Sequence, residues 1–184
     1  MEIQITQDLV QKKSITPNDA GCLQYIEDFL TQKGFINETL TFGRVKNLWS
    51  VKRNNGPLLV FLGHVDVVPT GPENEWEHDP FSGYDDGTFI NGRGTGDMKG
   101  GIACFMSALS RIDVDSLNYS IGFLITADEE GPSKDGTVKV VEELLQRNEK
   151  IDFCLIGEPS TLETVGDNIR TVSYTHLTLP TNSN

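Results

Sequence analysis

The chain has 184 residues, of which 37% are hydrophobic and 23% charged, a balance typical of a globular protein with one hydrophobic core. Its formal net charge of -12 argues against nucleic acid and anionic membranes as partners, because their phosphates demand a basic surface. No run approaches the roughly 20 apolar residues that cross a bilayer, and the first residues lack the pattern of a secretory signal. We therefore expect a cytoplasmic protein whose partners are neither nucleic acid nor membrane.

The three cysteines, Cys22, Cys104 and Cys154, are widely separated and lie in apolar surroundings. They show no C-x-x-C spacing, which disulfide frameworks and thiolate metal sites commonly have. We expect all three to be buried free thiols.

Helical and strand-like hydrophobic patterns alternate along the chain. Thr16-Pro17-Asn18-Asp19 has the pattern of an N-cap followed by a first-turn proline, and it predicts a helix that Gly34 ends. Continuous apolar runs predict buried strands, with amphipathic helices between them. In chain order these elements are a strand over 47–52, a strand over 58–62, a helix over 102–112, a strand over 121–126, a helix over 138–145 and a strand over 151–156.

This alternation predicts an α/β fold. Strand, helix and strand in succession imply right-handed crossovers, so we expect three layers, with a largely parallel sheet and helices on both faces. Residues 69–96 are rich in Gly, Pro, Asp and Asn and are predicted as loop, with a short hairpin near Asp85-Asp86-Gly87. We assign residues 1–170 to the domain. Residues 171–184 are Thr-rich and continue no element, so we interpret them as a foreign tail.

Metal-capable side chains follow each of the three predicted buried strands. In open parallel sheets, ligands bind beyond the carboxyl ends of the strands, so these side chains are expected to meet at one rim. Asp97, before the helix over 102–112, adds a further carboxylate. The rim residues are His64, Asp66, Asp97, Asp128, Glu129, Glu130 and Glu158.

So many carboxylates cannot all stay ionised at one rim without compensation. Two of them about 4 Å apart repel by roughly 4 kcal/mol at an effective dielectric near 20. Either several take up protons or metal ions neutralise them. One histidine among many oxygens suits zinc, manganese or cobalt, whereas an all-oxygen set favours calcium or magnesium. The surplus of carboxylates over one tetrahedral ion favours a two-metal site.

Four motifs in this region resemble, in order, those of the zinc-dependent aminoacylase and carboxypeptidase-type metallopeptidase family. They are residues 63–69 (GHVDVVP), 91–101 (NGRGTGDMKGG), 127–131 (ADEEG) and 157–159 (GEP). Residues 14–22 (SITPNDAGC) and 130–139 (EGPSKDGTVK) resemble the desuccinylase branch of that family. The resemblance extends over residues 1–170.

The resemblance implies a metal-ligand set. His64 and Glu158 would bind one Zn²⁺, and Asp97 would bridge it to a second Zn²⁺, which Glu130 would also bind. Co²⁺ is a possible substitute for zinc in such sites. The residues that the resemblance assigns to metal are therefore His64, Asp97, Glu130 and Glu158.

It also implies a reaction. Asp66 would hydrogen-bond the imidazole of His64 and fix its tautomer. Glu129 would be the general base that takes a proton from water and gives it to the leaving amine. The substrate of the desuccinylase branch is N-succinyl-LL-2,6-diaminopimelate, which yields succinate and LL-diaminopimelate in lysine biosynthesis.

Several alternatives remain open at this stage. Acetylornithine deacetylases, aminoacylases and dipeptidases of the same family would use the same metal machinery. The glycines at 94, 96 and 100 before a helix are also compatible with dinucleotide binding, although Asp97 would then face the pyrophosphate. Asp97 could instead cap that helix. A protein that keeps the fold without catalysis is a further possibility.

The chain also departs from the family pattern. The resemblance implies a dimerisation domain and a second zinc-binding histidine in segments that this chain does not match, and neither His78 nor His176 falls at a family position. We therefore expect a homodimeric parent protein. The chain by itself is expected to be inactive or nearly so, and to expose apolar sheet surface.

Overall fold

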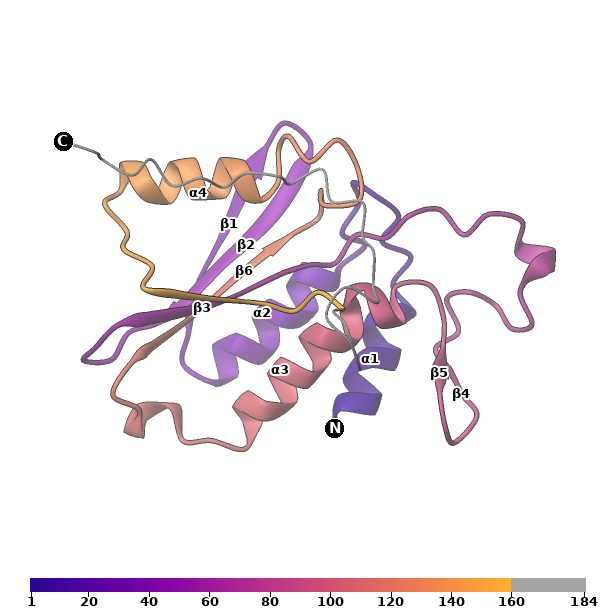
Figure 1. The fold of residues 1–184 in the computed structure, drawn as a ribbon, viewed down its shortest axis with the longest axis horizontal. Coiled ribbons are helices and arrows are strands. Elements are labelled where there is room, and N and C mark those ends of the chain that lie inside the picture. Colours follow the sequence, from indigo (N-terminus) through magenta and orange to yellow (C-terminus); the bar gives the residue numbers. More distant parts are fainter. Residues whose placement is uncertain (160–184) are drawn as a thin grey trace, which may run out of the picture.

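The computed structural model describes residues 1–159, so the predicted foreign tail over 171–184 and His176 lie outside the described residues. The described chain forms a five-stranded sheet with helices on both faces (Figure 1), which confirms the predicted α/β class. The strands lie in the order β1-β2-β6-β3-β7. None of the described helices has the length and apolar character that a membrane crossing requires.

The elements follow the predicted alternation, with two additions at the N-terminal side, α1 and β1. The helices are α1 (Glu2–Val10), α2 (Cys22–Gln32), α3 (Gly100–Ser110) and α4 (Thr137–Gln146). The strands of the main sheet are β1 (Ile36–Phe42), β2 (Val45–Lys52), β3 (Leu58–His64), β6 (Ser120–Thr126) and β7 (Phe153–Ile156). The shorter elements are the hairpin strands β4 (Tyr84–Asp85) and β5 (Ile90–Asn91), two 3-10 turns at Glu73–Glu75 and Val114–Ser116, and an irregular helical turn at Thr95–Lys99.

The sheet is mixed, and its parallel part is the part that positions the rim. β3 pairs in parallel with both β6 and β7, whereas β1 with β2 and β2 with β6 pair antiparallel. In this register His64 lies beside Thr126, and Leu62 lies beside Ile156. The chain therefore leaves β3, β6 and β7 at the same edge, as predicted.

Helices α1, α2 and α3 cover one face of the sheet and α4 covers the other (Figure 1). Leu9, Ile26 and Ile102 pack with Phe123 in the larger core cluster, and Leu144 of α4 belongs to a second cluster. Every residue of β6 is buried, because both faces of this central strand are covered. This explains the continuous apolar run in its sequence.

The prediction that a helix starts at Thr16 is wrong, because α2 begins only after a further turn. The N–H of Thr16 donates to the carbonyl oxygen of Val67 at 3.0 Å, and the N–H of Val67 donates to that of Ser14 at 2.9 Å. The segment is therefore extended beside the chain that leaves β3. The carboxylate of Asp19 accepts the N–H of Gly21 at 3.0 Å, and Gly21 has a left-handed φ of 83° before the helix begins.

The cysteines and the last strand are more exposed than predicted. All three thiols are free, as expected, but Cys104 on α3 and Cys154 on β7 are exposed, and only Cys22 is buried. Within the described residues β7 is paired on one side only, and Phe153 is 61% exposed. An apolar run in an edge strand therefore does not imply burial, and apolar sheet surface is exposed as expected.

A buried lysine joins α1 to the turn that precedes α3. Lys99 is 0% exposed, and its Nζ donates to the carbonyl oxygens of Leu9 at 2.8 Å and Lys12 at 2.9 Å. The carbonyls at the end of a helix lack intrahelical partners and carry partial negative charge, which an ammonium group offsets. Burial lowers the pKa of Lys99. The buried ammonium group thus hydrogen-bonds to two carbonyl oxygens in place of water.

Replacing this lysine tests the link. Lys99→Ala is expected to lower the free energy of unfolding by about 1–3 kcal/mol, since it removes the hydrogen bonds that the buried ammonium group donates to Leu9 and Lys12. Urea denaturation at neutral pH measures the change. Lys150, whose side chain is 83% exposed, provides the control, and Lys150→Ala should change stability by less than about 0.5 kcal/mol. Equal effects of the two substitutions would contradict the role given to Lys99.

Candidate metal centre

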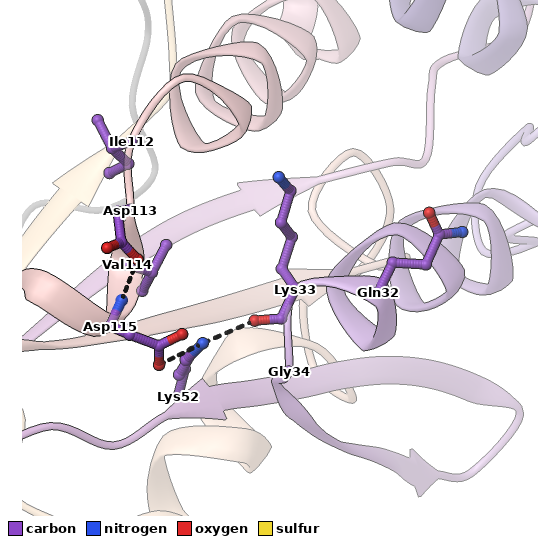
Figure 2. Close-up of a pocket in the computed structure, with 8 residues that line it drawn as sticks. All are labelled: Gln32, Lys33, Gly34, Lys52, Ile112, Asp113, Val114 and Asp115. Atoms are coloured by element: carbon purple, nitrogen blue, oxygen red, sulfur yellow. Dashed lines mark hydrogen bonds and ion pairs between the residues drawn. The ribbon is translucent and has the colours of Figure 1, made fainter.

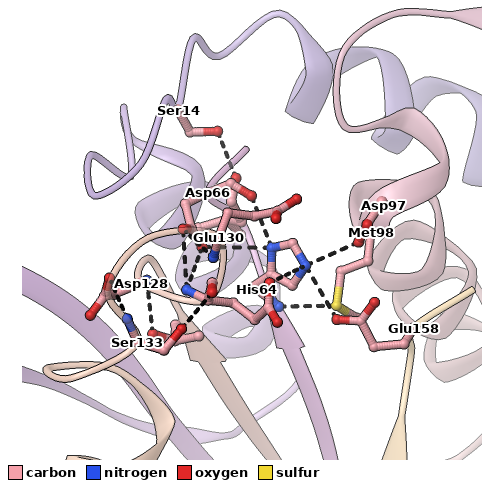
Figure 3. A network of polar contacts seen from close by, with 12 residues as sticks. Ser14, His64, Asp66, Asp97, Met98, Asp128, Glu130, Ser133 and Glu158 are labelled. Carbon is pink, nitrogen blue, oxygen red and sulfur yellow. Dashed lines mark hydrogen bonds and ion pairs between the residues drawn. The ribbon is translucent and has the colours of Figure 1, made fainter. Parts of the chain in front are cut away.

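The edge where β3, β6 and β7 end gathers acidic side chains around His64 (Figure 3). The His64 side chain is 1% exposed. Its Nε2 lies 3.1 Å from Asp97 Oδ1, 3.3 Å from Glu158 Oε1 and 3.7 Å from Glu129 Oε2. Three carboxylates from separate segments of the chain therefore face one ring nitrogen.

Two overlapping groups of side chains are close enough to share an ion. The ligand atoms of His64, Asp97 and Glu130 lie within 4.8 Å of one another. The same holds for His64, Glu129 and Glu158. The structure thus places every side chain that the sequence assigns to metal, together with the assigned base, around the same imidazole.

Asp66 connects His64 to the turn that follows β6. The Nδ1 atom of His64 lies 2.9 Å from the backbone carbonyl oxygen of Asp66 and 3.6 Å from its carboxylate Oδ1, so the carbonyl is the nearer partner. The carboxylate of Asp66 is fully buried and accepts the N–H groups of Glu129 at 3.2 Å and Glu130 at 3.1 Å. A carbonyl only accepts, so Nδ1 carries a proton, and Nε2 is the ring nitrogen that faces the carboxylates and is left for a cation.

Asp128 shapes the turn that carries the acidic pair at 129 and 130. It is 3% exposed, and its carboxylate accepts the backbone N–H groups of Ser133 at 3.2 Å, Lys134 at 3.0 Å and Asp135 at 3.0 Å. The hydroxyl of Ser133 donates to the carbonyl oxygen of Glu129 at 2.6 Å. The sequence places Asp128 at the rim without a role, because its partners are backbone groups that no motif reveals.

Asp97 lies in the irregular turn Thr95–Lys99, ahead of α3. The helix begins at Gly100 with Lys99 in its cap position, so Asp97 does not occupy the N-cap. The peptide bond between Asp97 and Met98 is cis. The carboxylate of Asp97 is 37% exposed, and its Oδ1 lies 3.1 Å from Nε2 of His64. The glycine-rich segment that carries Asp97 therefore faces the acidic rim.

The protonation states show what the cluster requires when no cation balances it. Burial by itself lowers the pKa of His64, but hydrogen bonds to Asp66, Asp97 and Glu158 outweigh it and raise the pKa to about 12. Burial, followed by the charge of Asp97, raises the pKa of Glu130. Without a cation, protons on these groups must offset the repulsion between the carboxylates.

The donor set fits a small divalent cation. One imidazole nitrogen with several carboxylate oxygens suits zinc and related ions. In a tetrahedral site with bonds near 2.1 Å, ligand atoms lie about 3.4 Å apart. The separations of 3.1 Å from Nε2 to Asp97 and 3.3 Å to Glu158 are close to that value.

A separate cavity of about 380 Å³ has Lys52 and Asp115 among its lining residues (Figure 2), and strand pairing places it at the other end of the sheet. Lys52, which lines it, pairs with Ile121 at the start of β6, whereas His64 pairs with the end of that strand. The Nζ of Lys52 is held by Asp115 at 2.7 Å and by the carbonyl oxygen of Lys33 at 3.0 Å. None of the predicted site residues lines this cavity.

Comparison with known proteins places this geometry in a family. The chain is 51% identical over 170 residues to succinyl-diaminopimelate desuccinylase of Marinobacter nauticus, and 53% identical over 171 residues to that of Hydrogenovibrio crunogenus. Each match covers 91% of this chain and 45% of the relative, so the chain spans less than half the length of these relatives.

Among solved structures, an M20 family metallo-carboxypeptidase from Sulfolobus solfataricus has the same fold, with a TM-score of 0.76 and 22% sequence identity. That match covers 86% of this chain and 37% of the carboxypeptidase. The model of peptidase family M20/M25/M40 matches residues 60–183, which include all the rim residues. The chain belongs to peptidase family M20/M25/M40.

Proposed function

We propose that this chain is the metal-binding part of a succinyl-diaminopimelate desuccinylase. The parent enzyme would hydrolyse the amide of N-succinyl-LL-2,6-diaminopimelate to succinate and LL-diaminopimelate with two Zn²⁺ ions, for which Co²⁺ can substitute. The observation that carries the metal chemistry is the approach of three carboxylates to Nε2 of His64 at 3.1 to 3.7 Å. The substrate assignment rests on the relatives of that name at 51% and 53% identity.

In this proposal four residues bind the two ions. His64 and Glu158 would hold the first ion, Glu130 would hold the second, and Asp97 would be a ligand to both. The order of distances from Nε2 supports this division, since Asp97 and Glu158 are the nearest oxygens. Glu129 is farther away at 3.7 Å, which suits a group that handles a proton beside the ion.

When bound, the ions would polarise the amide carbonyl and bring the pKa of water from about 15.7 towards 7. Glu129 takes a proton from the attacking water and delivers it to the amine nitrogen as the C–N bond breaks. The water oxygen joins the acyl carbon, which leaves as succinate. Asp66 binds the amide N–H of Glu129, and Ser133 binds its carbonyl, so the backbone of the base is held from both sides.

The remaining inferences concern the parent protein. We infer a cytoplasmic homodimer that acts on a small-molecule substrate, with neither nucleic acid nor membrane as a partner. The family resemblance supports the homodimer, and the net charge of -12 supports the absence of polyanionic partners.

Metal binding by the chain tests the ligand set. His64→Ala and Asp97→Ala are each expected to weaken Zn²⁺ binding by more than about 100-fold, since loss of outer-shell partners alone costs 10- to 100-fold. Competition with a chromophoric chelator measures the affinity. The control is His78→Ala, because His78 belongs to neither group of possible metal ligands. Its ring packs against Tyr84 of the hairpin, with 3.8 Å between the ring centroids. Unchanged Zn²⁺ affinity in the two ligand variants would exclude this site.

The pH dependence of binding should follow the ring proton. A folded-state pKa of His64 of about 12 means that the metal-free ring is protonated at neutral pH, so an ion that binds Nε2 must displace a proton. The affinity for Zn²⁺ should therefore rise about tenfold per pH unit between roughly pH 6 and 8 for this one proton. Calorimetry in buffers of different ionisation enthalpy measures the proton release. Binding without proton release would contradict the assignment.

Catalysis is tested in a chimera that joins residues 1–170 to the remaining part of the Marinobacter nauticus enzyme. The chimera should release succinate from N-succinyl-LL-2,6-diaminopimelate, and the chain alone should not. Glu129→Gln is expected to lower kcat by about 10²- to 10⁴-fold without loss of metal. Glu142→Gln, on an exposed glutamate of α4, should have no effect. If the chimera prefers acetylornithine or a dipeptide, the substrate assignment is wrong while the metal site stands.

A further inference from the structure

One buried side chain touches all three segments that carry the proposed first metal site (Figure 3). Met98 is 1% exposed and directly follows Asp97. Its Sδ accepts the backbone N–H of His64 at 3.2 Å. Its terminal methyl group reaches the glycines that precede His64 and Glu158 in the sequence.

The two glycines show how closely the methyl group is packed. A Cβ added at Gly63 would lie 2.7 Å from Met98 Cε, and one added at Gly157 would also lie 2.7 Å from it. Carbon atoms do not approach that closely in folded proteins, so an alanine at Gly63 would displace the thioether. An alanine at Gly157 would displace both the thioether and the ring of Phe61, whose Cζ would lie 2.6 Å away. The side chain of Met98 therefore packs against both the end of β3 and the chain that leaves β7.

We propose that Met98 is a positioning residue that sets the spacing of His64, Asp97 and Glu158. The inference rests on the proposed function of these three residues as metal ligands. The sulfur atom holds the backbone of His64, and the methyl group packs against Gly63 and Gly157, where the ligand-bearing ends of β3 and β7 begin. Because Asp97 is its neighbour in the chain, the same side chain also anchors the third ligand.

A thioether suits this place better than a branched side chain. Methionine is unbranched and adapts to irregular gaps, and its sulfur is a weak acceptor. Leucine has a similar volume but branches at Cγ and accepts no hydrogen bond. It would leave the buried N–H of His64 without this partner, at an energetic cost. We therefore expect the shape of the side chain and its sulfur atom to contribute separately to the Zn²⁺ affinity of the site.

Met106 provides a matched control. It lies on α3, is 0% exposed and belongs to the same core cluster as Met98. Replacing either methionine by alanine opens a cavity in that cluster and lowers the urea midpoint of unfolding. Only Met98 joins the ligand-bearing segments, so only its replacement should change the metal site.

The experiment compares Met98→Ala, Met98→Leu and Met106→Ala in the 184-residue chain. Zn²⁺ affinity is measured by chelator competition, the geometry of the site by the absorption spectrum of bound Co²⁺, and folding by urea denaturation. Met98→Ala is expected to weaken Zn²⁺ binding by about 10- to 100-fold and to alter the Co²⁺ spectrum, as the loss of an outer-shell partner does. Met98→Leu should give a smaller loss in the same direction, and Met106→Ala should keep the affinity and the spectrum.

Three results would overturn the inference. If Met98→Ala and Met98→Leu keep the affinity and spectrum of the unmodified chain, Met98 fills space only. If Met106→Ala weakens binding as much as Met98→Ala, the effect is general destabilisation. If Met98→Ala fails to fold, Met98→Leu takes its place, and an unchanged Zn²⁺ affinity and Co²⁺ spectrum in that variant overturn the inference. An unmodified chain that binds neither Zn²⁺ nor Co²⁺ would refute the proposed function first, and this inference with it.

Discussion

Repulsion between the carboxylates around His64 is the constraint on which the rest of the structure depends. Three of them approach one ring nitrogen within 3.7 Å, from three segments that are far apart in the sequence. Side chains that repel each other do not gather by themselves, so the scaffold must hold them. The parallel strands β3, β6 and β7 supply the common edge, and the buried contacts behind that edge keep each exit of the chain in place.

The structure neutralises its buried carboxylates in two different ways. Asp66 and Asp128 are 0% and 3% exposed, and backbone N–H groups satisfy both of them. The side chains of Asp97, Glu129 and Glu158 are 37%, 27% and 25% exposed and face the imidazole instead. The first pair is bound permanently by the protein. The second group keeps oxygens directed at one point, which is the arrangement that an exchangeable cation needs.

Sequence patterns predicted the parts of the fold whose cause is local or repetitive. The runs over 58–62 and 121–126 are apolar because both faces of β3 and β6 are covered, and the rim follows from their parallel pairing. Helix α1 and strand β1 were not predicted, since polar residues interrupt both. The packing of α1 also depends on α3, which is far away in the sequence. The exposure of β7 depends on its place at the edge of the sheet, which its own apolar residues do not encode.

Close packing explains why glycines precede two of the proposed metal ligands. Gly63 and Gly157 precede His64 and Glu158, and neither has the positive φ that the protein uses at Gly21 or Gly94. Backbone conformation therefore does not require glycine at these two positions. A Cβ at Gly63 would lie 2.7 Å from Met98 Cε, and one at Gly157 would lie 2.6 Å from Cζ of Phe61 and 2.7 Å from Met98 Cε, so side-chain packing favours glycine at both positions. The two glycines therefore reflect close packing and not chain flexibility. Through Met98, this packing links the ends of β3 and β7 to the turn that bears Asp97.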